Sequence, residues 1–374
     1  MKVLSLFDGM ACGMIAMRLA GVEIESYDAY EIDKYAIKTA QHNFPMIKEH
    51  GDVFDADFTH YDGVEFLIGG SPCTYWSIGQ TKNRETVASG MGWELFSQYV
   101  RALHEAKPKY FIYENNNSMS KAIRASIDET FGFEAVLINS ALVSAQSRQR
   151  LYWVGRRNED GTYSKVNVEQ PADRGILLKD VLDSVVASDL TFNDKSYTMT
   201  ASYDGACAWN TIERHQRNMV AERVPEYSSD KSRPLSASYA HKGDGEGSLK
   251  CDAFPDNPNK QVFDFVAEPV GTSVYAIEFD DDGKPIKAIG NGGKEITIYE
   301  VRNGLITIKG KQYPIKLEDG YYIIRKLTVS ECKRLQTVPE WYEFPVSNSQ
   351  AYKMLGNGWT CEVIAHILKS LKEA

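Results

Sequence analysis

One of the six cysteines of the chain lies in a sequence that is typical of a specialised turn. Cys73 follows the apolar run at residues 66–68 and the tetrapeptide Gly-Gly-Ser-Pro at residues 69–72. A cysteine is usually a small buried hydrophobe, but glycine and proline before it indicate that this thiol is presented at the end of a strand. A thiolate in such a place can act as a nucleophile and form a covalent intermediate.

A carboxylic acid and two arginines adjoin other predicted strands. Glu114 directly follows the apolar run at residues 110–113, and Arg148 and Arg150 precede the run at residues 151–154. A carboxyl group can share or donate a proton, and a guanidinium can hold a carbonyl oxygen or a developing negative charge. Two arginines before a strand are more commonly solvated surface charge or phosphate contacts, and this alternative stays open.

Acidic residues at successive strand ends indicate a cofactor that contains adenosine. Phe7, Asp8 and Gly9 form a Gly-rich turn after the first predicted strand, where a ligand can approach the backbone at a helix start. Glu31 ends the next strand and could hold ribose hydroxyls, and Asp52 could accept from an adenine amino group. Each alone could equally be a helix cap or a tight turn. Together and in this order, they predict a cofactor pocket at the carboxyl edge of a sheet.

Short apolar runs alternate with amphipathic stretches in the first third of the chain. The spacing of Phe96, Tyr99, Val100 and Leu103 predicts a helix over residues 94–106. This alternation of strands and helices favours a mainly parallel, doubly wound α/β sheet. The buried strands are expected at residues 2–6, 25–31, 65–68, 110–113 and 135–138.

The second half of the chain has a different pattern. Residues 230–260 are rich in Ser, Gly, Asp, Asn and Pro, as a long surface connection would be. Short β-type runs follow between residues 273 and 324, separated by Asp-Gly, Gly-Gly and Asn-Gly turns, and they predict an antiparallel meander. Helices are expected again at residues 328–335, which begin with a Thr-x-x-Glu capping box, and at residues 360–372.

Composition and charge limit the class of protein. With 374 residues, 43% of them hydrophobic, the chain can form two domains or one large domain with an insertion. It has no apolar run long enough to cross a bilayer and no signal-peptide pattern, so we expect a cytoplasmic protein with no membrane partner. The cysteines form no CxxC pair, which argues against a zinc site or a disulfide framework. The net charge of −9 is a caution against nucleic-acid binding but does not exclude it.

These motifs resemble those of the cytosine-C5 DNA methyltransferases, and their spelling is similar to that of animal de novo enzymes and of bacterial or phage relatives. The matching segments follow the family's order along the chain. They are Phe7-Asp8-Gly9, Glu31, Asp52-Val53, Pro72-Cys73, Glu114-Asn115, residues 146–150, residues 325–328 and residues 355–359.

The resemblance implies a particular architecture. The expected fold is α/β, a Rossmann-like S-adenosylmethionine-dependent methyltransferase fold into which a smaller, β-rich target-recognition domain is inserted. The catalytic domain would comprise residues 1–156 plus 325–374, and the target-recognition domain would comprise residues 157–324.

The resemblance also implies a reaction. Cys73 would add to C6 of a cytosine flipped out of double-stranded DNA, and S-adenosylmethionine would supply a methyl group to C5. Glu114 would bind N3 and the exocyclic amine, Arg150 would hold the O2 side of the base, and Arg148 would orient Glu114 or the loop of the nucleophile. The implied cofactor-binding residues are Phe7, Asp8, Gly9, Glu31, Ile32, Asp52, Val53, Pro72, Asn357 and Trp359.

Two positions differ from the family's usual spelling. Thr74 follows Cys73 where Gln is frequent, and Asn116 stands where Val is usual. Neither difference removes a chemically required group, but both could alter the base contacts or the turnover rate. Residues 74–92 could form a lid that closes over the base, and an ordinary surface loop is the alternative.

Binding to DNA requires a basic surface, and the candidate segments lie mostly in the insertion. A basic face formed by some of them would reconcile DNA binding with the acidic net charge. The candidates are residues 156–157, 214–217, 231–233, 241–242 and 309–311.

Two rival functions stay open. A branch with this architecture methylates cytosine in transfer RNA, although the long insertion favours sequence-specific contacts to duplex DNA. A regulatory homologue could bind DNA without catalysis, although the retention of Cys73 and Glu114 argues against it. We expect a monomer associated with the nucleoid, and a restriction endonuclease encoded nearby is a candidate partner.

Overall fold

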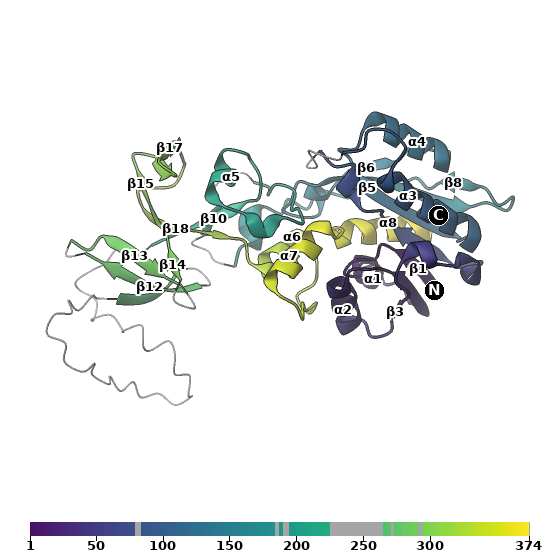
Figure 1. The fold of residues 1–374 in the computed structure, drawn as a ribbon, viewed down its shortest axis with the longest axis horizontal. Helices are drawn as coiled ribbons and strands as arrows, with labels where there is room; N and C mark the ends of the chain where they lie inside the picture. Colours follow the sequence, from purple (N-terminus) through teal and green to yellow (C-terminus); the bar gives the residue numbers. More distant parts are fainter. Residues whose placement is uncertain are drawn as a thin grey trace, which may run out of the picture. The chain divides into compact units, whose positions relative to one another are not determined.

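The computed structural model divides the chain into two compact units, each with its own sheets (Figure 1). The first unit contains Met1–Val181, Asp194–Gly205 and Thr328–Ala374, and the second contains Leu182–Asn193 and Ala206–Leu327. Of the helices described, none is both long enough and apolar enough to span a membrane. The structure describes residues 1–78, 84–183, 187–189, 194–224, 265–270, 273–280, 282–290 and 294–373.

A mixed sheet forms the centre of the first unit. Its strands lie in the order β3-β2-β1-β4-β5-β7-β6, and β8 pairs with β7. Strands β1 to β5 are parallel, whereas β7 runs antiparallel to β5 and β6. The strands are β1 (Lys2–Leu6), β2 (Ser26–Tyr30), β3 (Lys48–Glu49), β4 (Phe66–Gly69), β5 (Tyr110–Asn116), β6 (Val136–Asn139), β7 (Gln149–Arg157) and β8 (Tyr163–Lys165).

Strands form at all five runs predicted in the first third of the chain, but the last of them, β6, is only partly buried, since Leu137 is 39% exposed. Another difference affects the site. We expected Glu114 directly after its strand, but β5 continues to Asn116 because Glu114 pairs with Tyr152 and Asn116 with Arg150 of β7. The parallel strands also bring the carboxyl ends of β1, β2, β4 and β5 to one edge of the sheet. The candidate chemical groups therefore lie at a common edge.

Helix α3 (Met91–Ala106) shows how the core of the first unit is built. It buries Phe96, Tyr99 and Leu103, as its spacing predicts, and the Tyr99 hydroxyl donates to the Ile112 carbonyl at 2.9 Å. The helix begins earlier than residue 94 because Gly90 precedes it with a φ of 81°. The other helices of this unit are α1 (Cys12–Leu19), α2 (Lys34–Asn43), α4 (Lys121–Phe131), α6 (Val329–Leu335), α7 (Asn348–Asn357) and α8 (Cys361–Glu373).

The C-terminal helices complete the first unit. The capping box predicted at Thr328 and Glu331 is present at the start of α6, with both reciprocal hydrogen bonds. Helix α8, yellow in Figure 1, packs against α1, which places the C-terminal segment beside the N-terminal Gly-rich turn. The apolar face expected in residues 360–372 is therefore covered within this unit.

Two antiparallel sheets and the short helix α5 (Ala208–Ile212) make up the second unit. The turns Asn303-Gly304 (φ 52° and 68°) and Lys309-Gly310 (φ 52° and 75°) have the positive φ pairs of two-residue hairpins. The larger sheet has the order β17-β16-β15-β18-β10-β9 and the smaller β11-β12-β13-β14. The strands are β9 (Ala187–Asp189), β10 (Met219–Arg223), β11 (Phe265–Val270), β12 (Ser273–Phe279), β13 (Pro285–Ile289), β14 (Glu295–Ile296), β15 (Ile298–Arg302), β16 (Leu305–Ile308), β17 (Lys311–Pro314) and β18 (Gly320–Lys326).

The predicted meander is confirmed for β12 to β14 and for β15 to β17, but β18, expected next to β17, pairs with β15 and β10 instead. A second run also departs from the prediction. The apolar run at residues 296–299, expected as one strand, contributes to both sheets, because Ile296 pairs with β13 and Ile298 pairs with β18. Residues 230–260, expected as a surface connection, lie outside the described residues.

The two compact units do not coincide with the limits 157–324 expected for the insertion, since residues 157–181 belong to the first unit. Residues 194–205 belong to the first unit, since Lys195 donates from Nζ to the carbonyls of Ala141 and Ser144, and the Ser196 amide donates to Ala145. At the other end, β18 stays paired with β10 as far as Lys326. The second unit therefore ends at Leu327.

Candidate active site

The turn that carries Cys73 is fixed directly after β4. Cys73 begins a short 3-10 turn, and its carbonyl accepts from the amides of Trp76 (3.0 Å) and Ser77 (2.9 Å). A Cβ on Gly70 would lie 2.7 Å from the Glu114 carbonyl oxygen, so glycine is what allows the end of β4 to approach β5 this closely. The half-buried thiol is thereby presented beside Glu114.

The Glu114 carboxylate is buried and held from two sides. Its Oε1 forms an ion pair with Nε of Arg150 at 3.1 Å, and its Oε2 accepts from the indole N–H of Trp359 at 2.9 Å. Burial raises the pKa of Glu114, and the positive charges of Arg150 and Arg148 oppose this rise. Glu114 therefore keeps its proton to a higher pH than an exposed glutamate does.

Burial also raises the pKa of the Cys73 thiol. The positive charge of Arg150 lowers this pKa, and the negative charge of Glu114 raises it. Arg150 thus stabilises the ionised form of both Cys73 and Glu114.

Arg148 has a different environment from the one we expected. Its guanidinium is buried and donates to the carbonyls of Met199 (2.8 Å), Gly356 (3.2 Å) and Gly358 (2.9 Å). Burial and the neighbouring Arg150 lower the pKa of Arg148 to about 10. Arg148 therefore fixes the end of α7, while its charge also lowers the pKa of Glu114.

A cavity of about 440 Å³ joins these groups to the predicted cofactor residues. Lys353, at its rim, forms an ion pair with Asp33 at 2.6 Å, and the sequence reasoning missed this lysine. Its position in α7, three and four residues before Gly356 and Asn357, is the signal that could have found it. All the predicted site residues line the cavity: Phe7, Asp8, Gly9, Glu31, Ile32, Asp52, Val53, Pro72, Cys73, Glu114, Arg148, Arg150, Asn357 and Trp359.

The wall formed by Glu31 and Ile32 combines polar and apolar character. The Glu31 carboxylate accepts from the amides of Gly9, Ile32 and Asp33, each at 2.8 Å, which fixes its orientation. The next side chain, Ile32, is 72% exposed although it is apolar. An exposed aliphatic group beside a fixed carboxylate suits the ring and the hydroxyls of a nucleoside.

Asp8 provides a test of whether a cationic ligand fits this cavity. Its Oδ1 accepts from Ser5 Oγ (2.5 Å) and from the Tyr27 hydroxyl (2.6 Å), whereas among the described residues its buried Oδ2 has no hydrogen-bond partner. Burial raises the pKa of Asp8 to about 6 although both hydrogen bonds lower it. Asp8 lines the cavity, so its ionised carboxylate places a negative charge there that a cationic ligand would offset.

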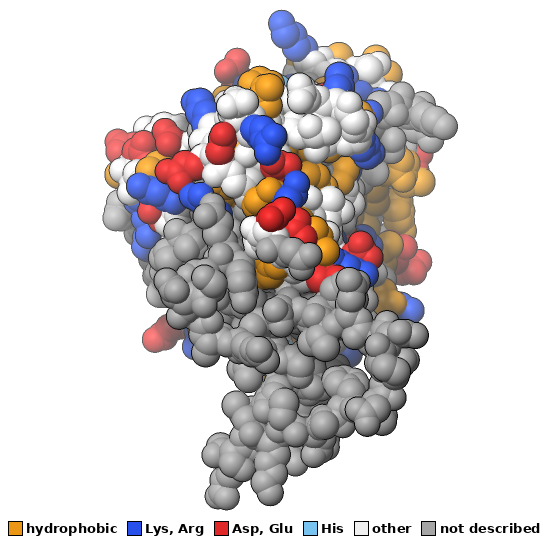
Figure 2. Space-filling view, turned by 90° about the vertical axis from the view of Figure 1, so that its left-hand side faces the viewer, with side chains coloured by type: hydrophobic (Ala, Val, Ile, Leu, Met, Phe, Trp, Pro, Cys, Tyr) orange, Lys and Arg blue, Asp and Glu red, His pale blue; other side chains and the backbone are white. Residues whose placement is uncertain are grey.

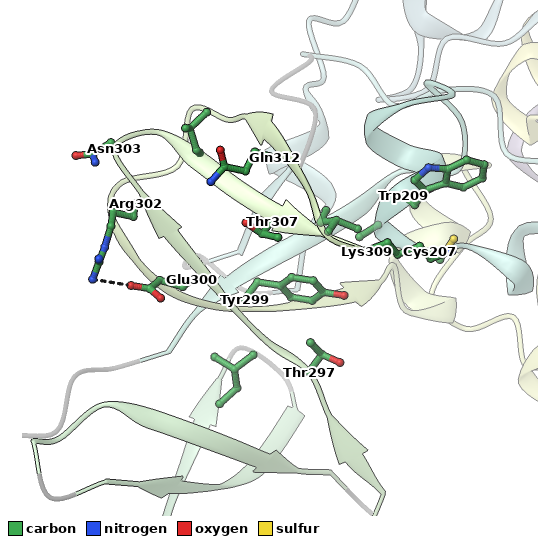
Figure 3. Close-up of a pocket in the computed structure, with 14 residues that line it drawn as sticks. Cys207, Trp209, Thr297, Tyr299, Glu300, Arg302, Asn303, Thr307, Lys309 and Gln312 are labelled. Atoms are coloured by element: carbon green, nitrogen blue, oxygen red, sulfur yellow. Dashed lines mark ion pairs between the residues drawn. The ribbon is translucent and has the colours of Figure 1, made fainter.

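The second unit has a pocket of its own, of about 690 Å³ (Figure 3). Figure 3 shows Thr307 and Gln312 on the strands β16 and β17, and these two residues pair across the sheet. Arg302 lies at one end of the hairpin and forms an ion pair with Glu300 at 3.0 Å. Polar side chains from β15, β16 and β17 therefore line this pocket.

Two cations meet one aromatic ring at the other end of this pocket. The guanidinium of Arg214 lies 4.5 Å and Nζ of Lys309 lies 5.2 Å from the ring centre of Trp209. The structure thus brings together two of the predicted basic segments, 214–217 and 309–311. The segments 231–233 and 241–242 lie outside the described residues. On the face displayed in Figure 2, Lys and Arg side chains are interspersed with Asp and Glu side chains.

Comparison with known proteins gives the family. The family model described as C-5 cytosine-specific DNA methylase matches residues 1–373. The chain is 25% identical over 448 residues to the orphan methyltransferase M.SPRI of Bacillus phage SPR, an alignment that covers 99% of this chain and 97% of the relative. It is 24% identical over 384 residues to the type II methyltransferase M.NlaX of Neisseria lactamica, covering 100% of this chain and 96% of the relative.

A solved structure shows the same fold. The crystal structure of a DNMT2 mutant of Spodoptera frugiperda superposes with a TM-score of 0.54 at 17% identity and covers 99% of each chain. The family model covers nearly every residue, and the family and the fold together imply a methyl donor. The chain therefore belongs to the C-5 cytosine-specific DNA methylases, and it is an enzyme that methylates cytosine in DNA at C5.

Proposed function

We propose that Cys73 is the nucleophile, that the target cytosine is flipped out of double-stranded DNA, and that S-adenosylmethionine is the methyl donor. The observation that supports this most directly is that one cavity is lined by Cys73, Glu114 and Arg150 together with the acidic residues suited to a nucleoside. A cytosine stacked in a duplex cannot present C6 to a thiol, so a flipped base is required.

The proposed reaction begins when the Cys73 thiol gives its proton to water and becomes a thiolate, which the positive charge of Arg150 stabilises. The Cys73 sulfur forms a bond to C6, the C5–C6 double bond opens, and the negative charge moves toward N3 and O2 of the base. S-adenosylmethionine, when bound, supplies the methyl group to C5. The proton on C5 then leaves to water, the C5–C6 double bond forms again, and the sulfur of Cys73 leaves as a thiolate.

Glu114 and Arg150 stabilise the charge that develops on the ring. A protonated Glu114 donates to N3 as the thiolate adds, and its raised pKa makes this proton available. Arg150 is placed to hold O2, and its ion pair with Glu114 at 3.1 Å orients the carboxyl group. Arg148 is a positioning residue, because its contacts are to the carbonyls around the end of α7.

The proposed cofactor contacts follow from the cavity wall. Glu31 holds the ribose hydroxyls, Ile32 and Val53 contact the adenine, and Asp52 accepts from its amino group. The negative charge of the ionised Asp8 carboxylate attracts the positively charged end of the methyl donor.

The second unit is proposed to recognise the DNA sequence. Its pocket is lined by Gln312 and Thr307. A glutamine can contact an adenine edge, and a threonine can contact a thymine methyl group. Arg302 and Lys309 lie at opposite ends of this face, separated by about four residues of β16, or roughly 13 Å at the usual rise of a strand. The major groove is about 12 Å wide, so the two cations suit phosphates on its two sides.

The proposal extends to the partner and the oligomeric state of the enzyme. The relatives bear names of both orphan and type II methyltransferases. The proposed partner is a restriction endonuclease encoded nearby. We propose a monomer, and sedimentation of the purified chain with and without DNA tests this state.

Covalent trapping tests the proposed nucleophile. DNA that contains 5-fluorocytosine at the target forms a stable adduct, because the fluorine cannot leave C5 as a proton does. The wild-type chain should form the adduct when S-adenosylmethionine is present, and the Cys73→Ser variant should not. Absence of an adduct on every DNA sequence tested, or an adduct with Cys73→Ser, would contradict the assignment. A parallel assay with transfer RNA distinguishes the RNA-modifying alternative.

A further inference from the structure

The turn that carries Cys73 is tied to strand β5 on one side and to the loop after β5 on the other. Before the cysteine, the side-chain amide of Asn115 donates to the Ser71 carbonyl at 3.1 Å. After it, Arg84 donates from Nε to the Trp76 carbonyl (3.3 Å) and from Nη2 to the Ser118 carbonyl (2.7 Å). The planar guanidinium thereby connects the end of the Cys73 turn to the loop that follows Glu114.

Asn116 belongs to the same set of contacts. Its buried side chain accepts at Oδ1 from Ser118 Oγ at 2.7 Å, and Ser118 Oγ in turn accepts from the Ile78 amide at 3.4 Å. The Asn116 Nδ2 donates to Asn115 Oδ1 at 3.1 Å. A valine at position 116 could make none of these hydrogen bonds, so the departure from the family's usual residue has a structural role in this chain.

A second anchor lies behind the turn. The Glu85 amide donates to the Tyr75 carbonyl (2.8 Å), and the Glu85 carboxylate accepts from the Trp76 indole (3.0 Å) and the Gly92 amide (3.2 Å). A Cβ at Gly92 would lie 2.5 Å from the Trp76 indole nitrogen, so this position requires glycine. Trp76 is fully buried, which makes the base of the turn part of the core.

We propose that Arg84, Ser118 and Asn116 are positioning residues that hold the Cys73 turn in register with Glu114. This inference rests on the proposed roles of Cys73 and Glu114. Two groups that act on one base must keep a fixed separation, and a misplacement of about 1 Å can reduce a rate by about a hundredfold. Because β4 and β5 both end near Cys73 and Glu114, hydrogen bonds beyond the strand ends supply the constraint that the sheet no longer provides.

The test measures the rate of adduct formation on 5-fluorocytosine DNA for Ser118→Ala and for Arg84→Lys. Each variant loses at least one of the hydrogen bonds, and we expect adduct formation to be about tenfold slower. The concentration of DNA at half-saturation and the affinity for S-adenosylmethionine should stay unchanged. Ser118→Thr keeps the hydroxyl and should restore the rate.

Ser97→Ala is the matched control, because Ser97 is also half-buried in the first unit and donates one hydrogen bond, to the Trp93 carbonyl at 2.9 Å. It should form the adduct at the wild-type rate. Wild-type rates in both Ser118→Ala and Arg84→Lys would overturn the inference, as would an equal loss in Ser97→Ala. If the wild-type chain itself forms no adduct, the proposed function fails rather than this inference.

Discussion

Trp359 donates its indole N–H to Oε2 of Glu114 at 2.9 Å, although 245 residues separate the two in the sequence. The other carboxylate oxygen, Oε1, is held by Arg150. The C-terminal segment therefore contributes directly to the environment of the proposed proton donor. This contact explains how a residue that lines the cofactor cavity can influence the base as well.

Trp359→Phe should lower the turnover rate and change its pH dependence. The hydrogen bond from Trp359 lowers the pKa of Glu114, so its loss raises that pKa further above the usual range. If the protonated form is required, activity falls as the pH rises through this pKa, and the alkaline limb should move to higher pH in the variant. We expect kcat to fall about tenfold, because the carboxyl group loses the hydrogen bond that orients it.

The control is Trp341→Phe, since Trp341 is 44% exposed and contacts Arg18 rather than Glu114. A pH profile of single-turnover methyl transfer for both variants provides the measurement. An alkaline limb that stays in place or moves to lower pH would show that Glu114 does not act as the acid.

Arg148→Met should destabilise the first unit. Removal of the buried guanidinium leaves the carbonyls of Met199, Gly356 and Gly358 without their donor, and we expect a loss of about 3 kcal/mol in the free energy of unfolding. Urea denaturation measures it. Arg124→Met is the matched control, because the Arg124–Asp128 pair at 3.8 Å lies near the surface and should contribute less than about 1 kcal/mol.

Asp8 should make the binding of S-adenosylmethionine depend on pH. Its pKa of about 6 lies above the ordinary value of 3.8, so the ionised form that attracts a cation is populated only as the pH rises through about 6. Affinity should therefore increase from pH 5 to pH 7 in the wild type. Calorimetric titration of Asp8→Asn should show weaker binding without this increase, and the same increase in the variant would assign the pH dependence to another group.

Without its ligand, the chain should become less stable to unfolding as the pH rises. This is opposite to the direction expected for the affinity. Because the pKa of Asp8 is raised in the folded state, folding favours the protonated carboxyl, and stability is lost as the pH rises from about 4 to about 6. A ligand with a positive charge should offset this loss. The thermal midpoint at pH 7 should therefore increase more on ligand binding than the midpoint at pH 5.

Much of the first unit could be predicted because its signals are local. Glu31 and Cys73 come just after predicted strands, and a parallel sheet brings the ends of such strands to one edge. The role of Arg148 could not be predicted in the same way. Its partners Met199 and Gly358 lie far along the chain. No sequence pattern indicates which backbone carbonyls accept hydrogen bonds from a buried guanidinium.

The second unit was less predictable for a related reason. A run of alternating β-type residues does not determine which strand it pairs with. The sequence therefore could not predict that the run divides at Thr297 between the two sheets. Likewise, Trp209 precedes Lys309 by a long stretch of chain, and only the fold shows that Arg214 and Lys309 share its ring. Non-local pairings of this kind depend on tertiary packing.

Lys309→Gln should weaken DNA binding in a manner that depends on salt. A lysine that neutralises one phosphate releases one condensed counterion, so the slope of log affinity against log salt concentration should decrease by about one. The loss should be similar for all DNA sequences, whereas Gln312→Ala should reduce affinity for one base pair at a single position by about tenfold. Fluorescence anisotropy at several salt concentrations measures both effects.

Lys287→Gln is the control for this prediction, because Lys287 lies on the smaller sheet and pairs with Glu295 at 3.3 Å. Its salt slope should equal that of the wild type. An unchanged slope in Lys309→Gln would show that Lys309 does not contact phosphate. Lys309 and Gln312 line the same pocket. If Lys309→Gln has a decreased slope and Gln312→Ala loses its preference for one base pair, both the phosphate contact and the base contact are made by this pocket.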